Sequence, residues 1–175
     1  VQDILNNTSS NDVLFDVGAY QGLYTALIAK IKSMKIVAFE PHPENRNILK
    51  DNLEINGLKA DIYPYALGNE CSMGHLNVIK SNAGQRGRLI DETQKRHTEV
   101  EVKSGVWFVN ETNIAPTIIK IDVEGKEREV IEGFGDVLDN CRLVYCEVHN
   151  PDYKKQLNEY LEGYGFEINT IFEQH

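Results

Sequence analysis

The octapeptide FDVGAYQG, residues 15–22, predicts a strand that ends in an acid and turns tightly into a helix. Gly18 and Gly22 bracket three residues of this turn. Glycine lets a backbone approach a ligand closely, and it also lets a helix begin directly against a strand. The turn could therefore hold a nucleotide-like ligand, or it could be a corner that holds nothing, and the octapeptide alone does not separate the two.

Four short apolar runs have the same form as the strand in this motif. They are VLFDV (13–17), KIVAFE (35–40), TIIKIDV (117–123) and RLVYCEV (142–148). Their apolar residues are continuous and do not alternate with polar ones, which is typical of parallel strands covered on both faces.

Helical patterns separate these strands, at residues 21–32, 43–56 and 151–162. Strands that alternate with helices indicate βαβ units with right-handed crossovers. We therefore predict an α/β fold with a Rossmann-like, doubly wound, mostly parallel sheet. The length of 175 residues favours a single domain over residues 1–175.

Residues 71–116 are too long for a simple crossover after the third strand, DIYPYALGN (61–69). We predict an insertion with two extra strands, GHLNVIK and TEVEVKS, and a short helix, joined by the glycine-rich loop SNAGQRGRL. Residues 71–104 hold six Lys or Arg and four Asp or Glu, so this part is net positive in a chain of net charge -9. The alternating tail GFEINTIFEQ (165–174) predicts an edge strand.

Composition restricts the class of partner and the compartment. The charge of -9 argues against general binding to nucleic acid. The sequence has neither an apolar run long enough to span a membrane nor a visible signal peptide. Cys71, Cys141 and Cys146 are odd in number and lack metal-site spacing, so we expect reduced thiols in the cytoplasm.

The choice of nucleotide rests on what surrounds the glycine turn. Glu40 ends the second strand 24 residues after Asp16, where a carboxylate can accept both ribose hydroxyls, although a strand-end acid can also be merely exposed. Ala66 is small enough to lie against an adenine ring. Tyr20 replaces the second glycine of a dinucleotide fingerprint, and the acid before Gly18 suits a cation better than a phosphate. S-adenosylmethionine, with its sulfonium and no phosphate, fits this site better than NAD.

The segments FDVGAYQGLYT, VAFEPHPENRNILKDNLEINGL, ALGNE, IIKIDVEGKEREVIEGF and LVYCEVH together resemble the FkbM family of S-adenosylmethionine-dependent methyltransferases. The resemblance covers roughly residues 12–149. It implies a Rossmann-like sheet and O-methyl transfer, often to sugar or polyketide hydroxyls. The sequence departs from the family pattern at Tyr20, where Asn is common, and in the tail, where the C-terminal hairpin of the family is not visible and we expect it to be shortened. The cofactor contacts that we predict are Asp16, Gly18, Ala19, Tyr20, Gly22, Glu40 and Ala66.

Catalytic groups are expected at the carboxyl ends of the fourth and fifth strands. KIDVEG offers Lys120, Asp122 and Glu124, and CEVH offers Glu147 and His149. We predict His149 as a general base oriented by Asp122, with Lys120 and Glu124 beside it. The alternatives are a buried ion pair that only fixes the strand ends and a surface or capping histidine.

A metal is the weaker mechanism. Asp122, Glu147 and His149 could hold Mg²⁺ or Mn²⁺, but the resemblance requires no metal, so we predict none. Arg86 and Arg88 lie in the cationic stretch 80–104 and favour an anionic small-molecule or glycan acceptor. A nicotinamide-dependent oxidoreductase and a non-catalytic nucleoside-binding module remain the alternative functions, and the oligomeric state is not predicted.

Overall fold

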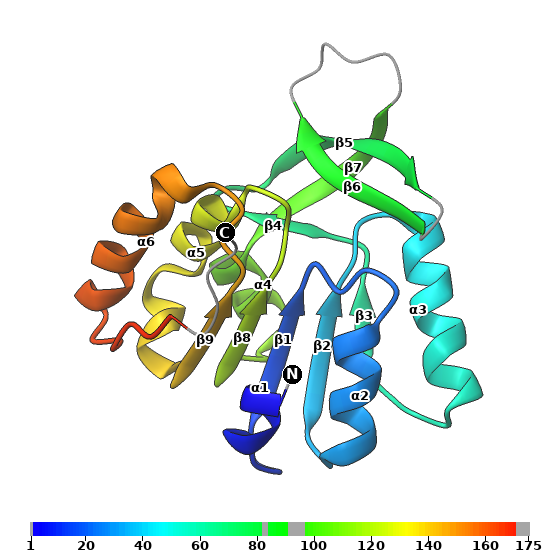
Figure 1. The fold of residues 1–175 in the computed structure, drawn as a ribbon, viewed down its shortest axis with the longest axis horizontal. Helices are drawn as coiled ribbons and strands as arrows, with labels where there is room; N and C mark the ends of the chain where they lie inside the picture. The colour runs from blue at the N-terminus through cyan, green and yellow to red at the C-terminus, as the bar shows by residue number, and fades with distance from the viewer. Residues whose placement is uncertain (1, 82–83, 91–96, 171–175) are drawn as a thin grey trace.

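The computed structural model describes residues 2–81, 84–90 and 97–170, with only the backbone described between 77 and 97. Its centre is a five-stranded sheet in which every neighbouring pair is parallel and the order is β3-β2-β1-β8-β9 (Figure 1). This confirms the predicted Rossmann-like α/β fold. The strands are β1 (Val13–Val17), β2 (Lys35–Phe39), β3 (Asp61–Tyr63), β8 (Ile118–Ile121) and β9 (Leu143–Cys146).

Helices cover both faces of the sheet because alternate strand residues point to opposite sides. Phe15 and Ile119 pack in one cluster with apolar residues of α4 (Gly105–Thr112), α5 (Glu127–Phe134), η1 (Gly135–Asn140) and α6 (Pro151–Gly163). Leu14 and Ile118 pack with residues of α1 (Gln2–Asn6) and α2 (Leu23–Ile31), and Ala38 packs with residues of α3 (Pro43–Ile55). The strands are thus buried from both sides, as their continuous apolar runs predict.

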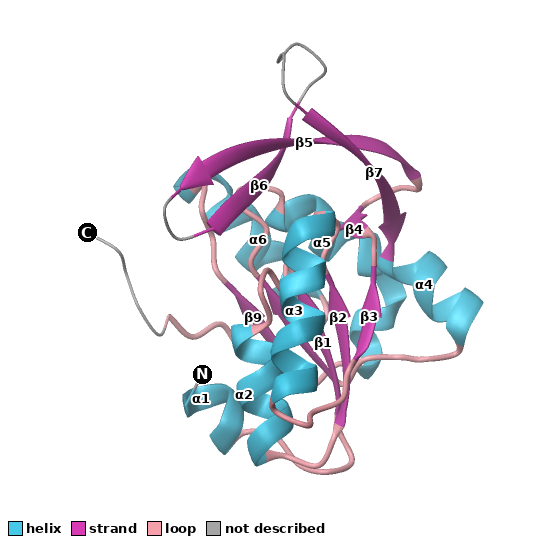
Figure 2. Cartoon of the chain, turned by 90° about the vertical axis from the view of Figure 1, so that its right-hand side faces the viewer, coloured by secondary structure: helices cyan, strands magenta, loops and turns pink. Residues whose placement is uncertain are grey.

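A second sheet lies over the carboxyl ends of the central strands (Figures 1 and 2). It has the order β4-β7-β5-β6, with β4 (Ala66–Gly68), β5 (Ser72–Ser81), β6 (Gly84–Ile90) and β7 (His97–Ser104). The two predicted insertion strands and the short helix α4 are present. Most of the segment predicted as a glycine-rich loop is strand, however, because residues 84–89 belong to β6, which pairs with β5.

The predicted third strand is also divided between the sheets. Tyr63 ends β3 in the central sheet, and Ala66 begins β4 in the second. Pro64 lies between them and has no backbone N–H for a ladder, so it ends the pairing with β2. This division carries the chain from the central sheet to the sheet above it.

The tail is not an edge strand in the described residues. Residues 164–170 contain no strand, and the remainder of the predicted segment lies outside the described residues. Gly165 has φ +83° and its N–H donates to Glu162, while the Phe166 N–H donates to Leu161. These donors close the end of α6, so they do not enter a ladder. Phe166 and Ile168 pack against the cluster that contains Phe15 and Ile119, which explains why apolar and polar residues alternate in this segment.

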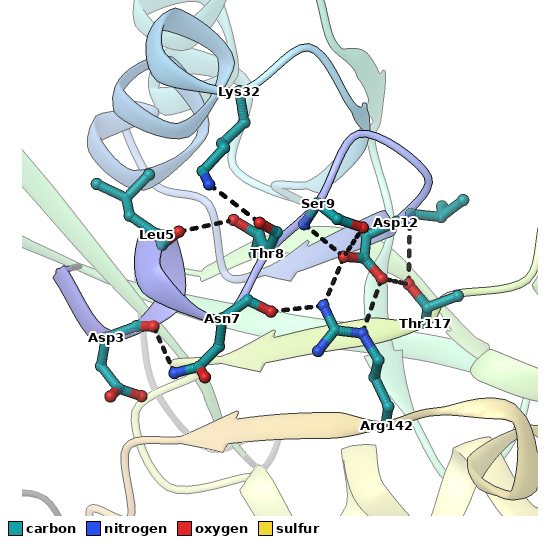
Figure 3. Close-up of polar contacts among 10 residues, drawn as sticks. Asp3, Leu5, Asn7, Thr8, Ser9, Asp12, Lys32, Thr117 and Arg142 are labelled. Atoms are coloured by element: carbon teal, nitrogen blue, oxygen red, sulfur yellow. Dashed lines mark hydrogen bonds and ion pairs between the residues drawn. The ribbon is translucent and has the colours of Figure 1, made fainter.

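Asp12 ties the amino-terminal end of the sheet together (Figure 3). Its carboxylate accepts hydrogen bonds from Arg142 Nε at 2.9 Å, Thr117 Oγ1 at 2.8 Å and Ser9 N at 2.7 Å. The bond from Arg142 holds the pKa of this carboxyl well below its usual value, although burial opposes the shift. One acid therefore joins the chain before β1 to the residues that precede β8 and β9. No helix in the described part of the chain has the length and apolar character needed to cross a membrane.

Candidate active site

A cavity of about 250 Å³ opens at the carboxyl ends of β1, β2, β8 and β9. The strand order reverses between β1 and β8, which is where doubly wound sheets bind ligands. Leu76 of β5 contributes to the lining, so the second sheet forms part of the wall. The other apolar residues of the lining are Val17, Phe39, Pro41, Tyr65, Ala66, Leu67 and Val123.

Gly18 is required by close packing at the cavity edge. It has φ +77°, and a Cβ built on it would lie 1.9 Å from the backbone oxygen of Asp122. A side chain here would separate the turn from the residue that follows β8. Gly18 lines the cavity, as predicted for a cofactor contact.

Gly22 has a different role, because a Cβ there would lie 2.8 Å from Cγ of Leu49 on α3. Ala19 is buried against the same helix residue. Neither residue belongs to the cavity lining. Gly22 and Ala19 thus pack the turn against α3, and their contact with a cofactor stays a prediction.

Asp16 and Lys120 form a buried ion pair, with Lys120 Nζ 3.1 Å from the Asp16 carboxylate. Thr25 donates to the other Asp16 oxygen at 2.6 Å, and Lys120 also donates to the backbone oxygen of Gly18 at 3.3 Å. Burial works against the charge of Lys120, but Asp16 and Asp122 outweigh it and raise its pKa. Neither Asp16 nor Lys120 lines the cavity, so the geometry matches the structural alternative in which they brace the turn.

Glu40 places a buried carboxylate in the cavity wall, with 5 % of the residue exposed. One oxygen accepts the backbone N–H of Tyr20 at 2.8 Å, and the other accepts that of His42 at 2.8 Å. Burial raises the pKa of Glu40 to about 7, against the lowering effect of these hydrogen bonds. Oε1, the oxygen that accepts from His42, also accepts a long hydrogen bond from Asn45 Nδ2 at 3.5 Å. Tyr20 is the one donor to Oε2 in the described residues, so Oε2 can accept a bond from a ligand while Glu40 fixes the turn.

Two lining residues have a left-handed backbone without being glycine. Tyr20 has φ 53° and Glu124 has φ 56°. A left-handed backbone costs a non-glycine residue conformational energy, which the surrounding structure has to offset. Residues of this kind are concentrated at functional sites. Because β8 ends at Ile121 and Glu124 has a left-handed backbone, Asp122 and Glu124 lie in the turn after the strand and do not continue its alternation.

His149 lies among four carboxylates. Its Nε2 is 3.8 Å from Asp122 Oδ1, 3.7 Å from Glu124 Oε2 and 3.8 Å from Glu147 Oε1. Its Nδ1 is 2.8 Å from Glu127 Oε1. Burial lowers the pKa of His149, but the bond to Glu127 and the neighbouring charges outweigh it, so the pKa is raised above its usual value.

The same residues bear on the metal alternative. Asp122, Glu124 and His149 have ligand atoms within 4.8 Å of one another. The set differs from the predicted alternative, because Glu124 takes the place of Glu147. Oxygen-rich groups with one imidazole can hold Mg²⁺ or Mn²⁺, so the arrangement permits a cation without requiring one.

The predicted acceptor residues Arg86 and Arg88 lie in β6, and their side chains are outside the described part of the structure. Lys103 of the same cationic segment is described. It pairs with Glu101 at 2.9 Å and lies 4.8 Å from the centre of the Trp107 ring.

Sequence reasoning missed several groups at the cavity. Tyr65, Leu76, Asn45 and Lys126 line it, and Glu127 contacts His149 from the first turn of α5. Glu127 carried one signal, because it follows KIDVEG by only two positions. Lys126 carried the same signal, because it follows KIDVEG directly, whereas Leu76 carried none, since it reaches the cavity only through the second sheet.

Comparison with known proteins identifies the family to which this fold and cavity belong. The model of the methyltransferase FkbM domain matches residues 16–168. The chain belongs to the FkbM methyltransferase family. The resemblance read from the sequence motifs is therefore confirmed.

Three individual proteins are informative. "Hexuronic acid methyltransferase AglP" of Haloferax volcanii is 29 % identical over 147 residues, and the match covers 83 % of this chain but 59 % of that protein. "Methyltransferase sdnD" of Sordaria araneosa is 26 % identical, with 93 % and 76 % covered. A solved rRNA methylase from Streptococcus thermophilus has a TM-score of 0.56 at 12 % identity, covering 93 % of this chain and 75 % of the other. This last likeness concerns the fold alone.

Proposed function

We propose that this FkbM-family chain transfers a methyl group from S-adenosylmethionine to an oxygen of a sugar-type acceptor. The observation that carries the proposal is the single cavity wall shared by Gly18, Glu40, Asp122 and His149. It joins a nucleoside-type site at β1 and β2 to acid–base groups at β8 and β9.

The cavity residues fit the adenosine part of the proposed cofactor. Glu40 offers carboxylate oxygens that can accept the ribose hydroxyls, and Ala66 with Leu67 and Phe39 offers an apolar wall for a ring. Gly18 has no side chain, so a ligand can approach the backbone of the turn closely. S-adenosylmethionine would supply an electrophilic methyl group, and its sulfur would keep the electron pair of the broken bond to carbon.

The acidic lining fits the rest of that molecule. Asp122, Glu124 and Glu147 place negative charge beside the cavity, and this attracts a ligand with a sulfonium and an ammonium group. A nicotinamide dinucleotide carries phosphates, which the same charges repel. Together with family membership, this counts against the oxidoreductase alternative.

The acceptor side of the cavity holds a base. His149 Nε2 takes the proton of the acceptor oxygen, while Lys126 lines the same cavity and can contact a negative group of the acceptor. Exclusion of water and alignment of the oxygen complete what the chain has to supply. A non-catalytic nucleoside-binding module would not need His149 and Lys126 in its cavity, which counts against that alternative.

The acceptor class is supported by the relative from Haloferax, whose name specifies a hexuronic acid. We propose a sugar with a carboxylate, bound in part by Arg86 and Arg88 of the overlying sheet. The double variant Arg86→Ala/Arg88→Ala should raise KM for such an acceptor, and the increase should shrink with added salt. Wild-type kinetics would show that these arginines do not bind the acceptor.

We also propose a cytoplasmic location, which the free thiols of Cys71, Cys141 and Cys146 support.

The decisive experiment is methyl transfer from isotope-labelled S-adenosylmethionine to a panel of acceptors. The panel holds uronic-acid glycans, neutral glycans and a structured RNA. Label on a glycan supports the proposal, and label on RNA alone would contradict both the acceptor class and the expectation from net charge. Calorimetry with S-adenosylhomocysteine and NADH tests the cofactor separately, and binding of NADH alone would overturn it.

A further inference from the structure

Glu127 is the one carboxylate beside His149 that is nearly inaccessible to solvent, with 1 % of the residue exposed. Its Oε1 accepts the backbone N–H of Gly125 at 2.7 Å and lies 2.8 Å from His149 Nδ1. The helix α5 and the turn before it therefore hold this oxygen in place from two directions.

This contact selects one tautomer of the imidazole. A carboxylate oxygen only accepts hydrogen bonds, and Oε1 accepts one from Gly125, so with Glu127 as a carboxylate the proton shared with His149 is carried by Nδ1. The lone pair of the neutral ring is then on Nε2, which is the nitrogen nearer to Asp122, Glu124 and Glu147. These three oxygens lie at 3.7–3.8 Å, which is beyond hydrogen-bond distance, so Nε2 can still accept a proton from another group.

We propose that Glu127 is a positioning residue that fixes the Nδ1–H tautomer of His149, and that the acceptor oxygen is therefore a hydroxyl. The second part rests on the proposed function. A carboxylate is already a nucleophile and needs no base, whereas a hydroxyl loses its proton during methyl transfer. The hydroxyl proton passes to Nε2, the oxygen bonds to the methyl carbon, and the electron pair of the carbon–sulfur bond stays on sulfur.

The surroundings of His149 support this role. Asp122, Glu124 and Glu147 face Nε2, Glu127 faces Nδ1, and Lys126 is the cation in the described lining. The excess of negative charge stabilises the imidazolium that forms as the hydroxyl loses its proton. Methyl transfer to a carboxylate would need no proton acceptor at Nε2, so a neutral imidazole with its lone pair facing the cavity fits a hydroxyl acceptor better.

The first test needs neither cofactor nor acceptor. Two-bond ¹H–¹⁵N correlation spectra of histidine-labelled protein report the tautomer of each of the five histidines, and His149→Gln identifies the signal of this one. We expect the Nδ1–H form in the wild type and loss of its predominance in Glu127→Gln. An Nε2–H form in the wild type would overturn the proposal.

The second test is kinetic. Glu127→Gln should lower kcat by about a hundredfold or more, the scale of general-base catalysis, while the acceptor KM and the affinity for S-adenosylhomocysteine change little. Glu132→Gln is the matched control, because it removes the same charge from α5 at a residue that pairs with Arg128 and should keep wild-type kcat. Thermal unfolding checks that both variants fold. A wild-type kcat in folded Glu127→Gln would refute the positioning role.

The product decides the nature of the acceptor oxygen. A methyl ether survives mild alkali and supports a hydroxyl, whereas an ester hydrolyses and would overturn that part. If Mg²⁺ or Mn²⁺ restores activity after chelation and shifts the Nε2 signal, His149 is a ligand and the base role is wrong. Absence of S-adenosylhomocysteine binding would refute the proposed function. The tautomer measurement would still test the contact of Glu127 with His149, because it needs no ligand.

Discussion

Glu40 should make nucleoside binding depend on pH near neutrality. Its pKa is raised to about 7 by burial, and ribose hydroxyls donate hydrogen bonds, so the ionised carboxylate is the form that binds. Affinity should therefore rise with pH through this value and level off above it. Binding near pH 7 should release a fraction of a proton, because the ligand selects the ionised form.

The magnitude follows from the titration of one group. With a pKa of about 7, the ionised fraction is roughly 0.09 at pH 6 and roughly 0.9 at pH 8. Affinity should thus increase about tenfold over this interval, or about 1.4 kcal/mol. The assay is calorimetric titration from pH 6 to 8 with adenosine beside S-adenosylhomocysteine. Adenosine has the ribose but no amino acid, so groups that titrate near the amino acid, such as His149, do not contribute.

Glu40→Gln should remove this pH dependence and weaken binding at pH 8 by about 1.5–3 kcal/mol, the range for a hydrogen bond to a charged group. The amide keeps one acceptor, so either Tyr20 or His42 loses its partner and some stability is lost as well. Glu44→Gln removes an exposed acid from the first turn of α3 and is the matched control. A flat wild-type profile, or a folded Glu40→Gln variant that retains the profile, would refute the reasoning.

Gly18→Ala should destabilise the fold by more than about 3 kcal/mol and abolish S-adenosylhomocysteine binding, because its Cβ would overlap the Asp122 backbone oxygen. Gly57→Ala, with a similar φ but open space around the Cβ, should cost only about 1–2 kcal/mol in the same denaturant unfolding experiment. Arg142→Ala should cost about 1–3 kcal/mol, since Arg142 is half exposed while Asp12 is buried. Because the fold lowers the pKa of Asp12, its contribution is complete above the unfolded value of about 4 and is lost as pH falls, so unfolding between pH 6 and 3 should show a shallower decline in the variant. Treatment with EDTA should leave methyl transfer unchanged, and activity that returned only with Mg²⁺ or Mn²⁺ would contradict the prediction of no metal.

The central sheet could be predicted because its determinants are local. A strand such as β1 is a continuous apolar run, and its burial by helices on both faces follows from that run alone. Glu40 could be located by the same logic, since a parallel strand brings its carboxyl end to the ligand edge of the sheet. The second sheet could not be predicted in full, because β6 is rich in glycine and polar residues and is specified by its pairing with β5.

The contacts of individual side chains were also predictable only where they depend on nearby sequence. Asp16 and Lys120 are acidic and basic residues at predicted strand ends, and the sequence could not show that they face each other within the layer between the sheet and α2. Gly22 and Ala19 belong to a ligand motif by pattern, yet their neighbours come from α3, which the pattern does not contain. The pattern thus predicts the position of the cavity, whereas the packing partners of each motif residue come from elements outside the pattern.

The pair of Asp16 and Lys120 also has a consequence for the site itself. Lys120 contacts the carboxylates of Asp16 and Asp122 and the backbone oxygen of Gly18, so one buried cation links the turn after β1 to the end of β8. Loss of the cation would leave Asp16 charged and buried, and it would also release both cavity edges. Lys120 does not line the cavity, yet its contacts fix the spacing between the turn after β1 and the end of β8. The proposed methyl transfer would depend on that spacing, since a displacement of one ångström can outweigh the loss of a contact group.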